Sequence, residues 1–142
     1  MAILVDTSGL FAYIDADDRH HLGVRAFISS TIEALILPAG VLPEIDYLVA
    51  SRLGVRVELA MLRAIAEGEF DLEALTPSDL RRAIELIDQY AGSDIGLVDA
   101  SIVAAAERLG ITRILTLDRR HFGMIRPRHC AAFTLLPLHE PV

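Results

Sequence analysis

Short apolar runs alternate along the chain with longer segments in which apolar residues recur every three to four positions, as at Ile45, Leu48 and Val49. The short runs have the length of buried strands, and the longer segments have the period of helices. This alternation predicts an α/β fold around a parallel sheet. The predicted strands cover residues 2–5, 34–37, 70–75, 112–117 and 132–136, and the predicted helices cover residues 7–14, 20–30, 44–53, 55–67, 78–90 and 97–109.

Proline and glycine mark the limits of several predicted helices. Pro43 precedes one helix, and Gly110 ends the last one. Pro77 follows Thr76, which we expect to cap the helix that comes next. The sequence contains no internal repeat or linker, so we expect residues 1–142 to form a single domain.

Composition fits a protein with a packed core. Hydrophobic residues make up 53% of the 142 residues and charged residues 23%. No apolar run approaches the ~20 residues that a membrane span requires. The segment from Met1 to Asp6 lacks the basic start and long apolar stretch of a signal peptide. We therefore expect a cytoplasmic protein that has no contact with a membrane.

The charges narrow the chemistry. The net charge is −7, and all 13 basic residues are arginine, which excludes any mechanism that needs lysine. Cys130 is the single cysteine, so the chain has no internal disulfide and no zinc-binding Cys/His pattern. An acidic protein does not attract nucleic acid through its overall field. If it binds nucleic acid, metal ions and a local arginine patch must supply the attraction.

Four carboxylates stand at the ends of predicted elements, in apolar surroundings. Asp6 follows the first strand and Asp118 follows the fourth, whereas Glu44 and Asp99 lie in the first turns of apolar helices. A carboxylate in a first turn can simply stabilise the helix, so each position also has a structural explanation. Ligands of parallel α/β sheets bind beyond the carboxyl ends of the strands. We therefore expect the four acids to converge on one pocket there.

Carboxylates that gather at one edge repel one another. At ~4 Å and an effective dielectric constant near 20, each close pair costs roughly 4 kcal/mol. Because no lysine can relieve this repulsion, the site requires a cation. Oxygen ligands select hard ions such as Mg²⁺ or Mn²⁺, which can activate water for attack on phosphorus. The acids therefore indicate phosphoester chemistry.

The same four segments resemble the motifs of the PIN-domain family, and of its VapC-type toxins in particular. The order and spacing of the segments agree over the whole chain, and all four acids are present. The segments that carry the resemblance are Val5-Asp-Thr-Ser-Gly-Leu10, Pro43-Glu-Ile-Asp-Tyr-Leu48, Gly96-Leu-Val-Asp-Ala-Ser-Ile-Val-Ala104 and Thr116-Leu-Asp-Arg-Arg-His-Phe122.

The resemblance implies a three-layer α/β/α fold with a central, mainly parallel sheet of four to five strands. It implies a Mg²⁺-dependent endoribonuclease, with Mn²⁺ as a possible substitute, in which Asp6, Glu44, Asp99 and Asp118 are the metal ligands and catalytic residues. It further implies the toxin of a type II VapBC toxin–antitoxin system, a homodimer, and inhibition by a VapB-like antitoxin.

Several neighbours of the acids are candidates for supporting roles. Thr7, Ser8 and Thr116 lie beside the acids and are candidates for orienting them or a water molecule, or for capping a helix or ending a strand. Asp94, five residues before Asp99, is a candidate for supporting that residue or capping its helix.

A basic segment directly follows the last acid. Arg119, Arg120 and His121 are candidates for binding RNA because they adjoin Asp118. The alternative is an ordinary solvated basic stretch.

Other protein classes fit less well. A haloacid-dehalogenase-like phosphatase needs a second Asp where this chain has Ser8, and both it and a phosphoacceptor receiver domain need a lysine. The remaining alternative is a non-catalytic PIN-like scaffold that binds RNA or protein. Such a scaffold would be expected to have lost acids of the site, and this chain has lost none.

Overall fold

Strands and helices alternate along residues 1–138, the residues that the computed structural model describes. The strands are β1 (Ala2–Val5), β2 (Ala34–Pro38), β3 (Asp71–Glu73), β4 (Arg113–Leu115) and β5 (Thr134–Leu136). The helices are α1 (Thr7–Ile14), α2 (His21–Ser30), α3 (Val41–Leu53), α4 (Val55–Ala66), α5 (Pro77–Gln89), α6 (Leu97–Leu109) and α7 (Arg119–Met124). None of these helices combines the length and the apolar character needed to cross a bilayer.

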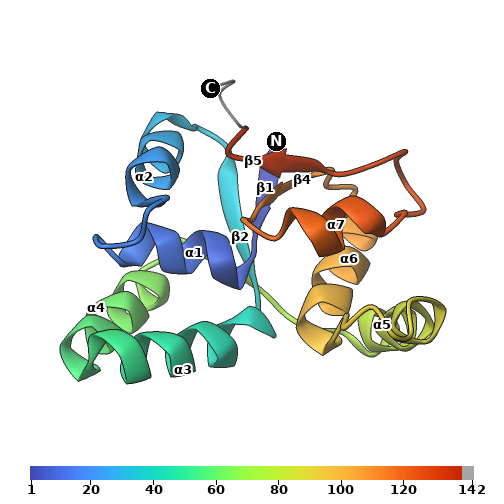
Figure 1. Ribbon diagram of the computed structural model, residues 1–142, viewed down its shortest axis with the longest axis horizontal. Coiled ribbons are helices and arrows are strands. Elements are labelled where there is room, and N and C mark those ends of the chain that lie inside the picture. The colour runs from blue at the N-terminus through green and yellow to red at the C-terminus, as the bar shows by residue number, and fades with distance from the viewer. Residues whose placement is uncertain (139–142) are drawn as a thin grey trace.

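All five strands are parallel and form one sheet in the order β3-β2-β1-β4-β5. Helices α1 to α4 lie on one side of the sheet and α5 to α7 on the other (Figure 1). The predicted three-layer α/β/α fold is confirmed. The strand order reverses between β1 and β4, and ligands of such sheets bind at the carboxyl ends of the strands at this reversal.

The central strands are buried on both faces. Ile3, Leu4 and Val5 of β1 have no exposed surface, and neither have Ile114 and Leu115 of β4. Strands covered on both faces have continuous apolar sequences, which is why these runs stand out in the chain. The core therefore fixes the two strands that lead to Asp6 and Asp118.

Two ion pairs join α5 to α6. Arg82 Nε donates to Glu107 at 2.7 Å, and Arg108 Nε donates to Asp79 at 2.9 Å. Asp79 is only 3% exposed and also forms a capping box with Thr76, so the predicted cap at Thr76 is confirmed. These contacts hold α6 in place, and the first turn of α6 carries Asp99.

Some element boundaries differ from the prediction. Helix α3 begins at Val41, so Pro43 lies inside its first turn and not before it. The first turn tolerates proline because its N–H groups have no partner within the helix. The strands predicted over residues 70–75, 112–117 and 132–136 are each only three residues long.

Helix α7 was not predicted. Its only buried residue is Phe122, so its sequence lacks the apolar periodicity that indicates a helix. Asp118, which we placed at the end of a strand, is instead the residue that caps α7, and its side chain accepts from His121 N at 3.0 Å. Strand β4 ends earlier, at Leu115.

Helix α1 packs directly on the backbone of β4, and Gly9 makes this possible. A Cβ atom at Gly9 would lie 2.7 Å from Leu115 O and 2.9 Å from Leu115 Cγ. No larger residue fits there without moving the helix or the strand. The close packing brings Ser8 within hydrogen-bonding distance of the segment that follows β4.

Candidate active site

Asp6 lies at the junction of β1 and α1, at the carboxyl edge of the sheet. Its N–H donates to Leu115 O of β4 at 3.0 Å, and Asp6 occupies the N-cap position of α1. Its carboxylate, which is almost fully buried, accepts from Ser8 Oγ at 3.0 Å and from Thr116 Oγ1 at 2.7 Å. Burial raises the pKa of the Asp6 carboxyl, and the two hydroxyl groups partly oppose this rise.

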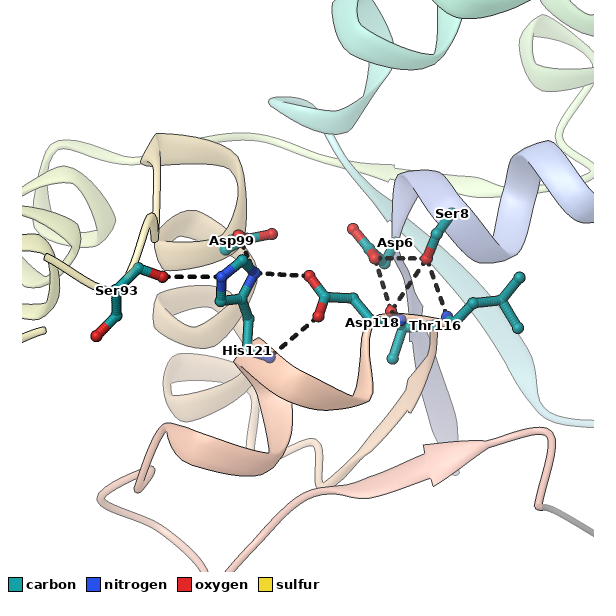
Figure 2. Close-up of polar contacts among 8 residues, drawn as sticks. Asp6, Ser8, Ser93, Asp99, Thr116, Asp118 and His121 are labelled. Atoms are coloured by element: carbon teal, nitrogen blue, oxygen red, sulfur yellow. Dashed lines mark hydrogen bonds and ion pairs between the residues drawn. The ribbon is translucent and has the colours of Figure 1, made fainter.

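Thr116 connects Asp6 to the segment that carries Asp118. Its fully buried hydroxyl donates to Asp6 and accepts from Asp118 N at 2.9 Å. Ser8 Oγ lies 3.2 Å from it and accepts from Leu117 N at 2.9 Å. Figure 2 shows these two hydroxyls side by side against Asp6. Ser8 and Thr116 thus hold the ends of two neighbouring strands in one geometry.

Asp118 faces a histidine. His121 Nδ1 lies 2.8 Å from Asp118 Oδ2 and 3.6 Å from Asp99 Oδ2, and its Nε2 lies 2.9 Å from Ser93 O (Figure 2). Both ring nitrogens face oxygen acceptors, an arrangement that suits a doubly protonated, positively charged ring. Hydrogen bonding to Asp118, with the charge of Asp99 in support, raises the pKa of His121.

Asp99 lies in the first turn of α6, where burial and the negative charges of the other acids raise its pKa. Burial and the negative charges of Asp6, Asp118 and Glu44 raise its pKa to about 6, against the opposing effect of His121. Glu44 approaches from the exposed first turn of α3. Of the four acids, Asp99 and Asp118 lie close enough to share one ion with His121, and the charges of Asp6 and Glu44 act on Asp99.

Other candidates lie outside this network. Thr7 Oγ1 is buried without a hydrogen-bond partner among residues 1–138. The N-cap of α1, a position that we had expected Thr7 or Ser8 to occupy, is Asp6. Asp94 is exposed and makes no side-chain hydrogen bond to another described residue, whereas its neighbour Ser93 contributes a carbonyl oxygen.

The structure places His121 differently from the sequence-based prediction. We grouped it with Arg119 and Arg120 as a residue facing RNA, but its ring points into the acid cluster. Arg119 instead donates to Pro137 O at 2.7 Å, and Arg120 is exposed. The available signal was a histidine three residues after Asp118, a spacing that places both on one side of a helical turn.

A divalent cation fits this group of side chains. One donor atom each of Asp99, Asp118 and His121 lies within 4.8 Å of the others. Within residues 1–138, the ion pairs of the two carboxylates are those with the imidazole ring of His121, and two of the three possible donor atoms are carboxylate oxygens. Such donors favour hard cations of the Mg²⁺ and Mn²⁺ type.

Comparison with known proteins identifies the family of this chain. The sequence model of the PIN domain matches residues 3–125. The chain belongs to the PIN-domain family. All four acids lie within the matched part of this PIN domain.

A named relative of this PIN domain is a VapC protein. The chain is 41% identical over 135 residues to ribonuclease VapC26 of Mycobacterium tuberculosis, which covers 95% of the chain and 100% of that relative. The predicted resemblance to VapC-type members is confirmed.

Solved structures share the fold. The crystal structure of M. tuberculosis VapC20, described as a sarcin-ricin loop cleaving toxin, has a TM-score of 0.78 at 24% identity, over 84% of this chain and 92% of that one. DNA-bound VapBC from Salmonella typhimurium has a TM-score of 0.68 at 16% identity, over 95% of this chain and 96% of that one.

The Thr116 hydroxyl should contribute measurably to stability. Thr116→Val keeps the shape of the side chain but leaves Asp6 and the Asp118 N–H without this partner, so we expect it to lower the free energy of unfolding by about 2–3 kcal/mol. Thr116→Ser keeps the hydroxyl and loses one methyl group, which should cost only about 1 kcal/mol. Urea denaturation of the metal-free proteins measures both, and a Thr116→Val protein that is as stable as the parent would mean that packing alone explains the position.

Proposed function

We propose that this protein is a metal-dependent endoribonuclease and the toxin of a VapBC-type toxin–antitoxin system. The observation that carries the proposal is the environment of Asp99, which has donor atoms of Asp118 and His121 within 4.8 Å and whose pKa is raised to about 6 by burial and by the negative charges of Asp6, Asp118 and Glu44. A carboxyl group with several acidic neighbours at the carboxyl edge of a parallel sheet is suited to binding a cation.

The four acids would hold Mg²⁺, with Mn²⁺ as a substitute. When bound, such an ion neutralises the carboxylates and makes water a better nucleophile towards a phosphodiester. Ser8 and Thr116 orient Asp6 through their hydrogen bonds, and His121 holds Asp118. Thr7 supports Asp6 through its backbone N–H and not through its side chain, and Asp94 makes no side-chain hydrogen bond within residues 1–138.

RNA is the substrate class that the relatives support. VapC26, which is 41% identical to this chain, is named a ribonuclease. The net charge of −7 fits a substrate that is attracted locally, by a metal ion and nearby arginines. We infer hydrolysis of RNA within a strand as the reaction.

A VapB-like antitoxin is the proposed partner. Related solved structures include VapBC complexes. An apolar groove of about 140 Å³ lies between α1 and α4 and is lined by residues such as Leu10, Tyr13, Val57, Met61 and Phe70. An amphipathic antitoxin helix would match such a surface. We also propose a homodimer that acts in the cytoplasm.

Cleavage of a pooled RNA tests the proposal. We expect the protein to cut RNA in Mg²⁺ or Mn²⁺ and to be inactive in EDTA, and Asp6→Asn to be inactive in all three buffers. Addition of either ion should raise the melting temperature of the parent protein, because a ligand that binds the native state stabilises it. A protein that binds RNA but cuts none in any of these buffers would instead be a PIN-like binding scaffold.

A further inference from the structure

A second groove, far larger than the apolar one, lies along α2 and the segment on either side of Asp118. Helix α2 forms one wall and the ends of β4 and β5 form the other, enclosing about 1060 Å³. Pockets for small molecules typically measure about 300–1,000 Å³. The groove is therefore large enough for a stretch of polymer.

The sheet topology leaves this groove open. Leu115 of β4 is covered by α1 at Gly9. Arg113 lies two residues before it on the same face of the strand, and Leu117, two residues past the end of β4, lines the same groove. Helices α6 and α7 lie on the opposite side of the sheet (Figure 1). The face of β4 and β5 next to α1 is thus walled by α2 without being covered by it.

The groove carries positive charge in an otherwise acidic protein. Arg19 and Arg119 both line it, and neither forms an ion pair with a carboxylate of residues 1–138. The arginines on the α5 side behave differently, since Arg82 and Arg108 are paired with acids. Arg113 also lines the groove, but its charge is compensated by Glu33.

Apart from the arginines, His20 and Ser30, the lining is apolar and includes an aromatic ring. Phe27 projects from α2, and Leu117, Leu136 and Pro137 line the opposite wall. Unpaired bases of single-stranded nucleic acid stack on such side chains, while arginines hold the phosphates. The combination of two arginines that have no carboxylate partner within residues 1–138 with an aromatic surface matches a single strand better than it matches a small anion.

The groove reaches the segment that carries Asp118. Leu117 and Arg119 line it, and the residue between them is Asp118. We propose that this groove binds single-stranded RNA immediately next to the phosphodiester that is cut, with Arg19 and Arg119 on its phosphates and Phe27 against a base. This inference rests on the proposed nuclease function. Arg120 does not line the groove, so the phosphate contacts fall to Arg19 and Arg119.

The test measures RNA binding separately from cleavage. The binding of a short fluorescein-labelled RNA of mixed sequence is followed by anisotropy in EDTA, over a range of salt concentrations. Arg19→Ala/Arg119→Ala should raise the Kd about tenfold or more. Because two phosphate contacts are lost, the slope of log K against log salt should fall by about 1.4. Phe27→Ala should raise the Kd with no change in that slope.

Arg25→Ala is the matched control. Arg25 is an exposed arginine of α2, the helix that forms one wall of the groove, but it does not line the groove. It should bind RNA like the parent. If Arg19→Ala/Arg119→Ala binds and cuts RNA like the parent, the groove proposal is overturned and the groove is assigned to a protein partner. Metal-dependent cleavage by the parent would in that case still support the nuclease function. A parent protein that neither binds nor cuts RNA overturns both.

Discussion

Asp99→Asn should abolish RNA cleavage and at the same time stabilise the metal-free protein. The Asp99 side chain is 20% exposed and its pKa is raised from 3.8 to about 6 by burial and by its acidic neighbours. One pKa unit corresponds to about 1.4 kcal/mol, so keeping Asp99 ionised at neutral pH costs the fold up to about 3 kcal/mol. Asparagine avoids this cost but cannot serve as a charged ligand, and cleavage should fall at least about 100-fold.

The stabilisation should depend on pH in one direction. The pKa of Asp99 is higher in the folded protein than in the unfolded chain, so the folded parent binds this proton more tightly. Its stability is therefore retained below the unfolded pKa near 4 and is lost as the pH rises to about 6. The advantage of Asp99→Asn should be small at the acidic end of this window and constant above pH ~7.

Urea denaturation in EDTA at several pH values measures this difference. Asp94→Asn is the matched control, because Asp94 is exposed, makes no side-chain contact within residues 1–138, and has a left-handed backbone that asparagine also tolerates. It should change the stability by less than about 0.5 kcal/mol at any pH. If Asp99→Asn were no more stable than the parent at neutral pH, the carboxylates would not be in the strained arrangement described here.

The fold could be predicted because its central strands leave a simple pattern. Strands β1 and β4 are buried on both faces, so their apolar runs are continuous, and an acid directly after each run lies at the same sheet edge. Asp6 and Asp118 could therefore be placed near each other without coordinates. The sequence could not show that Asp118 caps α7, since a short helix with one buried side chain has no periodicity.

The polar details of the site depend on contacts across long separations in the chain. Thr116 could be identified as a neighbour of Asp118, but its bond to Asp6 depends on how closely α1 packs on β4. The position of His121 depends on Ser93, which belongs to another loop. Arg119 and Arg120 are adjacent in sequence, yet only Arg119 lines the large groove, because α7 turns their side chains apart.

Gly9→Ala should be among the most damaging single-methyl changes in this protein. The added Cβ would lie 2.7 Å from the carbonyl oxygen of Leu115, and this backbone cannot move without disturbing the buried ladder between β1 and β4. Overpacking of this kind costs about 1–3 kcal/mol and sometimes more. Any relief that shifts α1 away from β4 separates Ser8 from Leu117 and Thr116, so RNA cleavage should decrease as well.

Gly23→Ala adds the same methyl group as Gly9→Ala, but we expect it to raise the stability of the protein. Gly23 is the third residue of α2, and a Cβ atom there meets no other atom within 4 Å. Alanine favours the helix over glycine by about 0.5–1 kcal/mol, so this variant should be more stable than the parent. Urea denaturation of both variants therefore separates packing from helix propensity: stabilisation by both substitutions would show that α1 does not pack on β4 at Gly9, and that the geometry around Asp6 has a different origin.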